Sequence, residues 1–408
     1  MKKTAIFIII AIILINPLLF KTGFAEIFPF AQYIDEMLGV FSFFWICKNW
    51  NKISNYERKI VYFVSLLLLV GLFCSYQHQV QTGLFPIVMD AFQCTKCFIS
   101  FICFNHVIFD MKDRDKIFII NRVNKVLPLF MVIAFIFAML NLFSDIGMHN
   151  TVRFGLRAFG FICDKSGTFS DQIFFYLLFL GTGFMISRNK AFYKLVIILT
   201  LITWMLTLRT RSIVYAPIFF FMFYYYVIKK NSFKRNYVTA ILIVIILFCF
   251  GADKIEYTYA HEEAGPRAAF LYSGIMLLIN YFPLGVGFAT FGTDMAAKNY
   301  SSLYYDLGFH HHWGMTPDDP RYLHDTYWPA IMGEFGFVGV VIIAIILFFI
   351  FKEIKEKYSD NRLSITLAFF VLFTMYFNST ATPVFFISYT VYLFMLLPLT
   401  YLKTLKKK

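Results

Sequence analysis

Long runs of apolar residues, separated by short clusters of polar and basic residues, cover most of this chain. A transmembrane helix needs roughly 20 consecutive apolar residues, and by that measure about twelve runs qualify as membrane spans. They lie near residues 4–20, 28–47, 60–77, 84–109, 126–143, 171–187, 191–208, 212–228, 237–252, 329–351, 363–378 and 383–402. The pattern predicts an all-α, polytopic integral membrane protein in which residues 1–408 form a single membrane domain.

The composition leads to the same fold class. Of the 408 residues, 59% are hydrophobic, only 15% are charged and 54 are Phe. A water-soluble protein could not cover that much apolar surface with so few charges. A net charge of +13 would suggest a nucleic-acid partner for a soluble protein, but here it indicates the excess of Lys and Arg that membrane proteins carry in their cytoplasmic loops. We therefore expect no nucleic acid among the partners.

The basic residues also predict the orientation of the chain. If the N-terminus is cytoplasmic and the loops alternate, most of the 37 Lys and Arg residues fall on the cytoplasmic side, and both termini are cytoplasmic. The one long polar segment, residues 253–328, then forms a large extracytoplasmic loop. Long loops are usually functional, and this one carries His261, His310, His311, His312 and His324.

Three further motifs lead us to expect neither a cofactor nor a metal. The glycines of residues 283–292 lack the spacing of a dinucleotide fingerprint and predict a tight turn near the membrane surface. The three consecutive histidines at 310–312 lack the spacing of known zinc motifs. Cys94 and Cys97 form a CxxC, but it has no second pair and lies inside a predicted helix.

Arginine side chains gather on the predicted outer side, against the usual charge bias. Arg209 and Arg211 lie between two spans with almost no loop to solvate them, and charge at membrane depth usually marks a functional site. Arg153 and Arg157 are four residues apart, so a helix would project both from one face. Arg267 lies in the long loop. A guanidinium suits phosphate binding, whereas headgroup anchoring and plain solvation are the structural alternatives for these side chains.

His324 and Asp325 stand at the mouth of a predicted span, and Glu334 follows inside or near that span. An imidazole titrates near neutral pH and can accept a proton from a hydroxyl group, so His324 is a candidate general base. A hydrogen-bonded histidine at the membrane interface is the alternative. The adjacency of Asp325 does not show that its carboxylate orients the ring.

Taken together, these segments resemble the O-antigen polymerase and ligase superfamily, which comprises the Wzy-type polysaccharide polymerases and the lipid A core ligases. The likeness rests on residues 206–212 with Arg211, on the Arg267 segment, on the turn at 283–288, and on residues 324–327 followed by 333–339. Many spans with one large outer loop late in the chain also fit the family. The chain departs from the family pattern at Asp325, where Asn is common, and Arg209 has no secure counterpart.

The resemblance implies a metal-independent, inverting glycosyltransferase of the bacterial cytoplasmic membrane. Its donor and acceptor would be undecaprenyl-diphosphate-linked oligosaccharides, with membrane lipids and a chain-length regulator as further partners. Arg211 and Arg267 would stabilise the diphosphate leaving group, and Arg209, Arg153 and Arg157 would assist. His324 would act as the general base, with Asp325 and Glu334 near the substrate.

Three functions remain open at this point. Analogy with the family favours a polymerase of O-antigen or capsule repeat units. A ligase would use the same chemistry with lipid A core as its acceptor. A flippase for the same lipid-linked sugars should instead place ionisable residues deep within its spans.

Overall fold

The computed structural model describes residues 3–19, 33–163, 165–230 and 265–403. Over these residues the chain is helical apart from one β-hairpin and the connecting loops, which confirms the predicted all-α class. Its longer helices are α1 (Lys3–Leu19), α3 (Ile34–Lys48), α4 (Asn55–His78), α5 (Leu84–Val107), α6 (Asp113–Phe143), α7 (Ser166–Ile186), α8 (Lys190–Leu206), α9 (Thr210–Met222), α11 (Pro266–Asn280), α14 (Trp328–Tyr358), α15 (Arg362–Asn378) and α16 (Ser388–Leu396). The shorter elements are η3 (Trp50–Lys52), β1 (His149–Arg153), β2 (Leu156–Phe159), η4 (Phe223–Ile228), α12 (Asp294–Lys298), α13 (Ser302–Asp306), η6 (Phe309–His311) and η7 (Leu397–Thr400).

Polar side chains and prolines in the sequence explain where several helices begin. Ser54 caps α4 by accepting from the backbone N–H of Glu57, whose carboxylate accepts from the N–H of Ser54 in return. Asn189 and Asn361 cap α8 and α15 in the same way with their side-chain oxygens. A proline opens α11 and another lies in the first turn of α14, where a missing N–H costs nothing.

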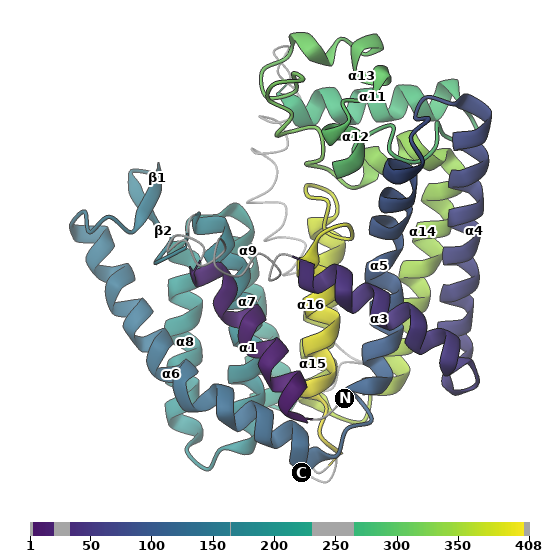
Figure 1. Ribbon diagram of the computed structural model, residues 1–408. Coiled ribbons are helices and arrows are strands. Elements are labelled where there is room, and N and C mark those ends of the chain that lie inside the picture. Colours follow the sequence, from purple (N-terminus) through teal and green to yellow (C-terminus); the bar gives the residue numbers. More distant parts are fainter. Residues whose placement is uncertain (1–2, 20–32, 164, 231–264, 404–408) are drawn as a thin grey trace.

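The helices form two groups that stand side by side (Figure 1). One group contains α1, α6, α7, α8 and α9, the other contains α3, α4, α5 and α14, and α15 and α16 contact members of both. The start of α1 and the end of η7 meet at the start of α6, since Lys3 pairs with Asp115 and Lys116 Nζ donates to the Tyr401 carbonyl at 2.9 Å. The first and last described helical segments therefore end on the same side of the molecule. That this side is cytoplasmic stays a prediction.

Six of the described helices are long and apolar enough to cross a membrane, which supports a membrane-embedded protein. They are Asn55–His78, Leu84–Val107, Asp113–Phe143, Ser166–Ile186, Thr210–Ile228 and Trp328–Tyr358, and shorter apolar helices cover Lys3–Ile15, Arg362–Asn378 and Ser388–Thr400. The expected count of about twelve spans is not confirmed. The predicted span at 237–252 lies outside the described residues.

The predicted outer loop is a folded unit over its described part, which begins at residue 265; residues 253–264 and His261 lie outside that part. Residues 266–327, here called the cap, contain α11, α12 and α13. The cap lies across the ends of α4, α5 and α14, away from the N and C labels (Figure 1). It has a small apolar core of its own, in which Phe270, Phe291, Tyr304 and Phe309 stack on one another.

Residues 283–293, here called the crossing segment, join the cap to α14 through close backbone contacts. α14 is interrupted at Gly336, whose φ of 63° lies in the left-handed region. Next to this break, the carbonyls of Gly333 and Glu334 accept from the N–H groups of Val286 and Gly287, both at 2.9 Å. The two glycine-rich motifs of the sequence therefore pack against each other, backbone to backbone.

Gly285 offers a direct test of this contact. A Cβ there would lie 2.4 Å from the backbone carbon of Glu334, so Gly285→Ala should destabilise the protein by about 1–3 kcal/mol. Gly265→Ala is the matched control, because no atom of the described residues lies within 4 Å of its Cβ position and its φ is −59°. Thermal unfolding of the two purified variants in detergent makes the comparison. Equal melting temperatures would contradict the close crossing.

Candidate functional site

The crossing segment lies buried among the helix ends, although it has no regular secondary structure; every residue from 285 to 293 is buried. Backbone N–H groups in such a place must find partners within the protein. Side chains from α4, α5, α13 and α14 provide them for five consecutive residues. The bonds are Phe288 N to Ser75 Oγ (2.9 Å), Ala289 N to Asp90 Oδ2 (2.6 Å), Thr290 N and Phe291 N to Glu334 Oε1 (3.0 and 3.2 Å), and Gly292 N to the Tyr304 hydroxyl (2.9 Å).

Glu334 thus has partners inside the protein, and its side chain is fully buried. Its predicted contact with substrate stays a prediction, since this arrangement gives the carboxylate a role in holding the crossing segment. Asp90 and Ser75 are not among the predicted site residues. A charged residue within an otherwise apolar run was the available signal for Asp90, whereas nothing in the sequence distinguishes Ser75.

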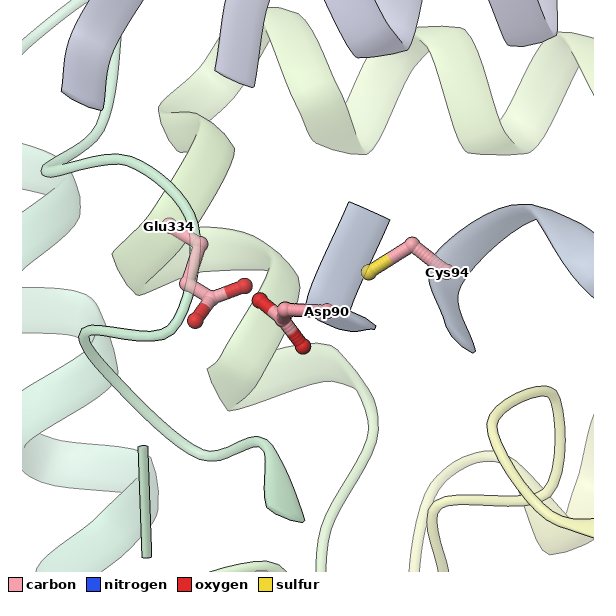
Figure 2. A group of neighbouring side chains, drawn as sticks. All are labelled: Asp90, Cys94 and Glu334. Atoms are coloured by element: carbon pink, nitrogen blue, oxygen red, sulfur yellow. The ribbon is translucent and has the colours of Figure 1, made fainter. Parts of the chain in front are cut away.

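Asp90, Cys94 and Glu334 form the one group of possible metal ligands found among the described residues (Figure 2). One ligand atom from each lies within 4.8 Å of the others, and all three side chains are buried. Asp90 and Cys94 share a face of α5 because they are four residues apart. Cys97, the other half of the CxxC, is not part of the group.

A second group brings together the arginines near the starts of α7 and α9. Arg211 Nη2 lies 2.9 Å from both carboxylate oxygens of Asp171 and 3.3 Å from the Gly167 carbonyl. Arg209 Nε donates to Ser166 Oγ at 3.1 Å, and its guanidinium lies close over Gly167, where a Cβ would approach it to 3.2 Å. We call Arg153, Arg209 and Arg211 with Asp171 the arginine group.

Arg153 enters this group from the β-hairpin, where its Nη1 lies 3.5 Å from the Leu208 carbonyl. The segment with Arg153 and Arg157 is a hairpin and not a helix, so the one-face arrangement that a helix would give does not occur. Arg153 pairs with Leu156 across the hairpin and Arg157 pairs with Val152, so the two arginines point to opposite faces. A tight turn at Phe154 and Gly155, both with positive φ, reverses the chain between them.

The arginine group carries more positive than negative charge. Burial, and next the neighbouring charges of Arg153 and Arg211, lower the pKa of Arg209 below its ordinary value. Asp171 is the only carboxylate that forms an ion pair with these arginines among the described residues. Three guanidinium groups against one carboxylate leave a net charge of about +2, which suits an anion such as a diphosphate.

A third group contains the other predicted site residues. Arg267, in the first turn of α11, donates from Nε and Nη2 to a single oxygen of Asp325, at 2.7 and 2.6 Å. Both side chains are about one-third exposed, at 34% and 29%. Asp325 therefore pairs with Arg267, and Asp325 is the residue that follows His324 in the sequence. His324 is half-buried, and its Nδ1 is buried without a partner among the described residues.

The arginine group lies beside the hairpin and the Arg267–Asp325 pair lies in the cap. The hairpin and the cap both lie on the side of the molecule away from the N and C labels (Figure 1). Among the described residues, these hydrogen bonds and ion pairs form within each group and do not connect one group to the other. The histidines at 310–312 lie elsewhere in the cap, where His310 stacks against His311 and Tyr305.

No family model, curated protein or solved structure matches this chain. The resemblance to the polymerase and ligase superfamily therefore stays an expectation drawn from the residues.

Two adjacent tyrosines test the account of the crossing segment. Burial raises the pKa of Tyr304 well above its ordinary range, so its neutral hydroxyl can accept from Gly292 N. Tyr304→Phe leaves this buried N–H unpaired and should cost about 1–3 kcal/mol of stability. Tyr305→Phe, at a side chain that is 51% exposed, should change stability by less than about 0.5 kcal/mol. Denaturant unfolding of both variants in detergent measures the difference, and similar losses would exclude Tyr304 from the network.

Proposed function

We propose that this protein is a polysaccharide polymerase. It joins oligosaccharide repeat units carried on undecaprenyl diphosphate at the outer face of the bacterial cytoplasmic membrane. The support is the resemblance of residues 205–340 to the superfamily together with one observation. Three arginines around a single carboxylate lie at the same end of the bundle as His324 and the Arg267–Asp325 pair.

The proposed reaction needs cationic stabilisation, because the leaving group is a lipid diphosphate that gains negative charge as the sugar departs. The arginine group has the uncompensated charge for this task. Arg267 is less free, since Asp325 already occupies two of its donors on one edge. We therefore assign the main diphosphate contact to Arg211 and Arg209, with Arg153 beside them, while Arg267 assists from the cap. Arg157 points away from Arg153 on the hairpin and has the weakest case.

His324 is the proposed general base. Its Nδ1 has no partner among the described residues, so the ring is not committed to a structural hydrogen bond there. A neutral imidazole could take the proton of an acceptor hydroxyl as that oxygen attacks the anomeric carbon. The attack occurs from the face opposite the diphosphate and inverts the configuration.

The cap offers aromatic surface for the growing glycan. Trp313 is 68% exposed and Tyr305 is 51% exposed, whereas Tyr304 is fully buried in the cap core. The aromatic residues of the cap that can face a glycan are therefore Trp313, Tyr305 and the partly exposed Tyr300.

A ligase that uses lipid A core as acceptor would need the same residues, and no observation here favours it. A flippase has one observation in its favour. Lys96 lies halfway along α5, buried, and ionisable residues at such depth often mark a transport path. Its ammonium is closed off by Asp35 at 2.5 Å and Glu36 at 3.3 Å, however, which is also what a structural ion pair between α3 and α5 requires.

Removing the proposed base gives the first test. In a strain that lacks the chromosomal gene, His324→Ala should lower polymer formation by about 10²- to 10⁴-fold while single-repeat glycolipid accumulates and the protein remains in the membrane. The control is His311→Ala, at an exposed histidine of the cap, which should leave the chain-length ladder on a gel intact. A normal ladder for His324→Ala would refute the base assignment. Bare core without any repeat in the deletion strain would favour the ligase.

Arg211 tests the diphosphate contact. Arg211→Lys keeps the positive charge and can keep an ion pair with Asp171, but it loses the planar fork. Losing one charge-assisted hydrogen bond should reduce the polymerisation rate by roughly 10- to 100-fold. Arg321→Lys is the matched control, because Arg321 is exposed in the cap and pairs only with Asp319 among the described acidic residues. Equal rates for the two variants, with purified protein and lipid-linked repeat units, would remove Arg211 from the mechanism.

A further inference from the structure

Each of the carboxyl groups of Asp90 and Glu334 has one oxygen with a partner and one without. Asp90 Oδ2 accepts from Ala289 N, and Glu334 Oε1 accepts from Thr290 N, Phe291 N and the Thr293 hydroxyl. Asp90 Oδ1 and Glu334 Oε2 are buried and have no hydrogen-bond partner among the described residues. The two carboxyl groups point toward each other (Figure 2), and an oxygen of each lies within 4.8 Å of the other.

Two ionised carboxylates would repel each other strongly in this setting. Both side chains are completely buried, so water does not screen them. A cation could offset the repulsion, but Lys96, the nearest basic residue along α5, has its ammonium bound to Asp35 and Glu36. The described ion pairs include no basic partner for either Asp90 or Glu334.

We propose that Asp90 and Glu334 bind a single proton between Asp90 Oδ1 and Glu334 Oε2, so that the pair carries one negative charge instead of two. The proton converts one unpaired acceptor into a donor and satisfies both oxygens with one hydrogen bond. The other two oxygens, Asp90 Oδ2 and Glu334 Oε1, keep their hydrogen bonds to the crossing segment. The proton site thereby joins α5 to α14 and fixes residues 289–293 between them.

A divalent metal is the competing occupant, with Cys94 as a third ligand. Zinc in a structural site is almost always bound by four ligands, and the described residues offer three side chains of the usual kind within 4.8 Å of one another. A proton needs no further ligand and accounts for both unpaired oxygens. Thus the geometry favours the proton, and metal content becomes a decisive measurement.

Amide variants separate a shared proton from two full charges. Asp90→Asn and Glu334→Gln each replace one carboxyl by a group of the same shape with a fixed N–H donor, and each leaves one negative charge. Both should melt within about 2 °C of the natural protein in detergent, whereas Asp90→Ala and Glu334→Ala should melt more than about 5 °C lower. Glu356→Gln, at an exposed residue of the same helix α14, controls for the amide itself. Amide variants as unstable as the alanine variants would overturn the proposal.

An infrared measurement detects the proton directly. The carbonyl stretch of a protonated carboxylic acid should be present in the natural protein and absent from both Asp90→Asn and Glu334→Gln. No such band in the difference spectra would overturn the proposal. So would one equivalent of divalent metal, measured by elemental analysis of protein purified without chelator, that disappears in Cys94→Ser.

Discussion

A buried N–H group without an acceptor costs free energy, and the crossing segment faces this constraint from residue 285 to residue 293. Ser75, Asp90, Glu334 and the Tyr304 hydroxyl meet it from four separate helices. Each acceptor can reach its N–H group only if its helix has the right position along its axis and the right rotation about it. The relative positions of α4, α5, α13 and α14 are therefore coupled through a few backbone amides, and the cap depends on that coupling.

Two kinds of charged group can be compared among the described residues. Lys96 and Lys116 are buried and have close partners, because Lys96 is bound by Asp35 and Lys116 donates to the carbonyls of Phe109 and Tyr401. The arginines beside the hairpin are partly exposed, and their positive charge exceeds that of the one carboxylate that pairs with them. Arg211 is an example of the second kind. It pairs with Asp171, and the neighbouring Arg153 and Arg209 add positive charge that this one carboxylate does not balance. A difference of this kind separates groups that hold helices together from groups that can meet a charged substrate.

The sequence was sufficient to predict the helical membrane class, because long apolar runs have no other common structure. That the arginines and His324 face the outer side of the membrane stays a prediction. Tertiary contacts decided the rest. The partner of Asp325 depends on where α11 lies, and the face of Arg153 depends on a hairpin too short to show in the periodicity. The burial of Glu334 depends on a segment that includes Thr290, 44 residues earlier in the chain, and no local pattern encodes the placement of that segment.

The interruption of α14 at Gly336 has a mechanical consequence. Backbone bonds run in both directions across it, from Val286 and Gly287 to α14 and from Val338 back to the Pro283 carbonyl. Swinging the cap away as a hinged lid would break these bonds together with the side-chain bonds to α5. The cap and the adjoining end of α14 should consequently move as one rigid body, so the proposed polymerase would open for its lipid-borne glycan between the two helix groups.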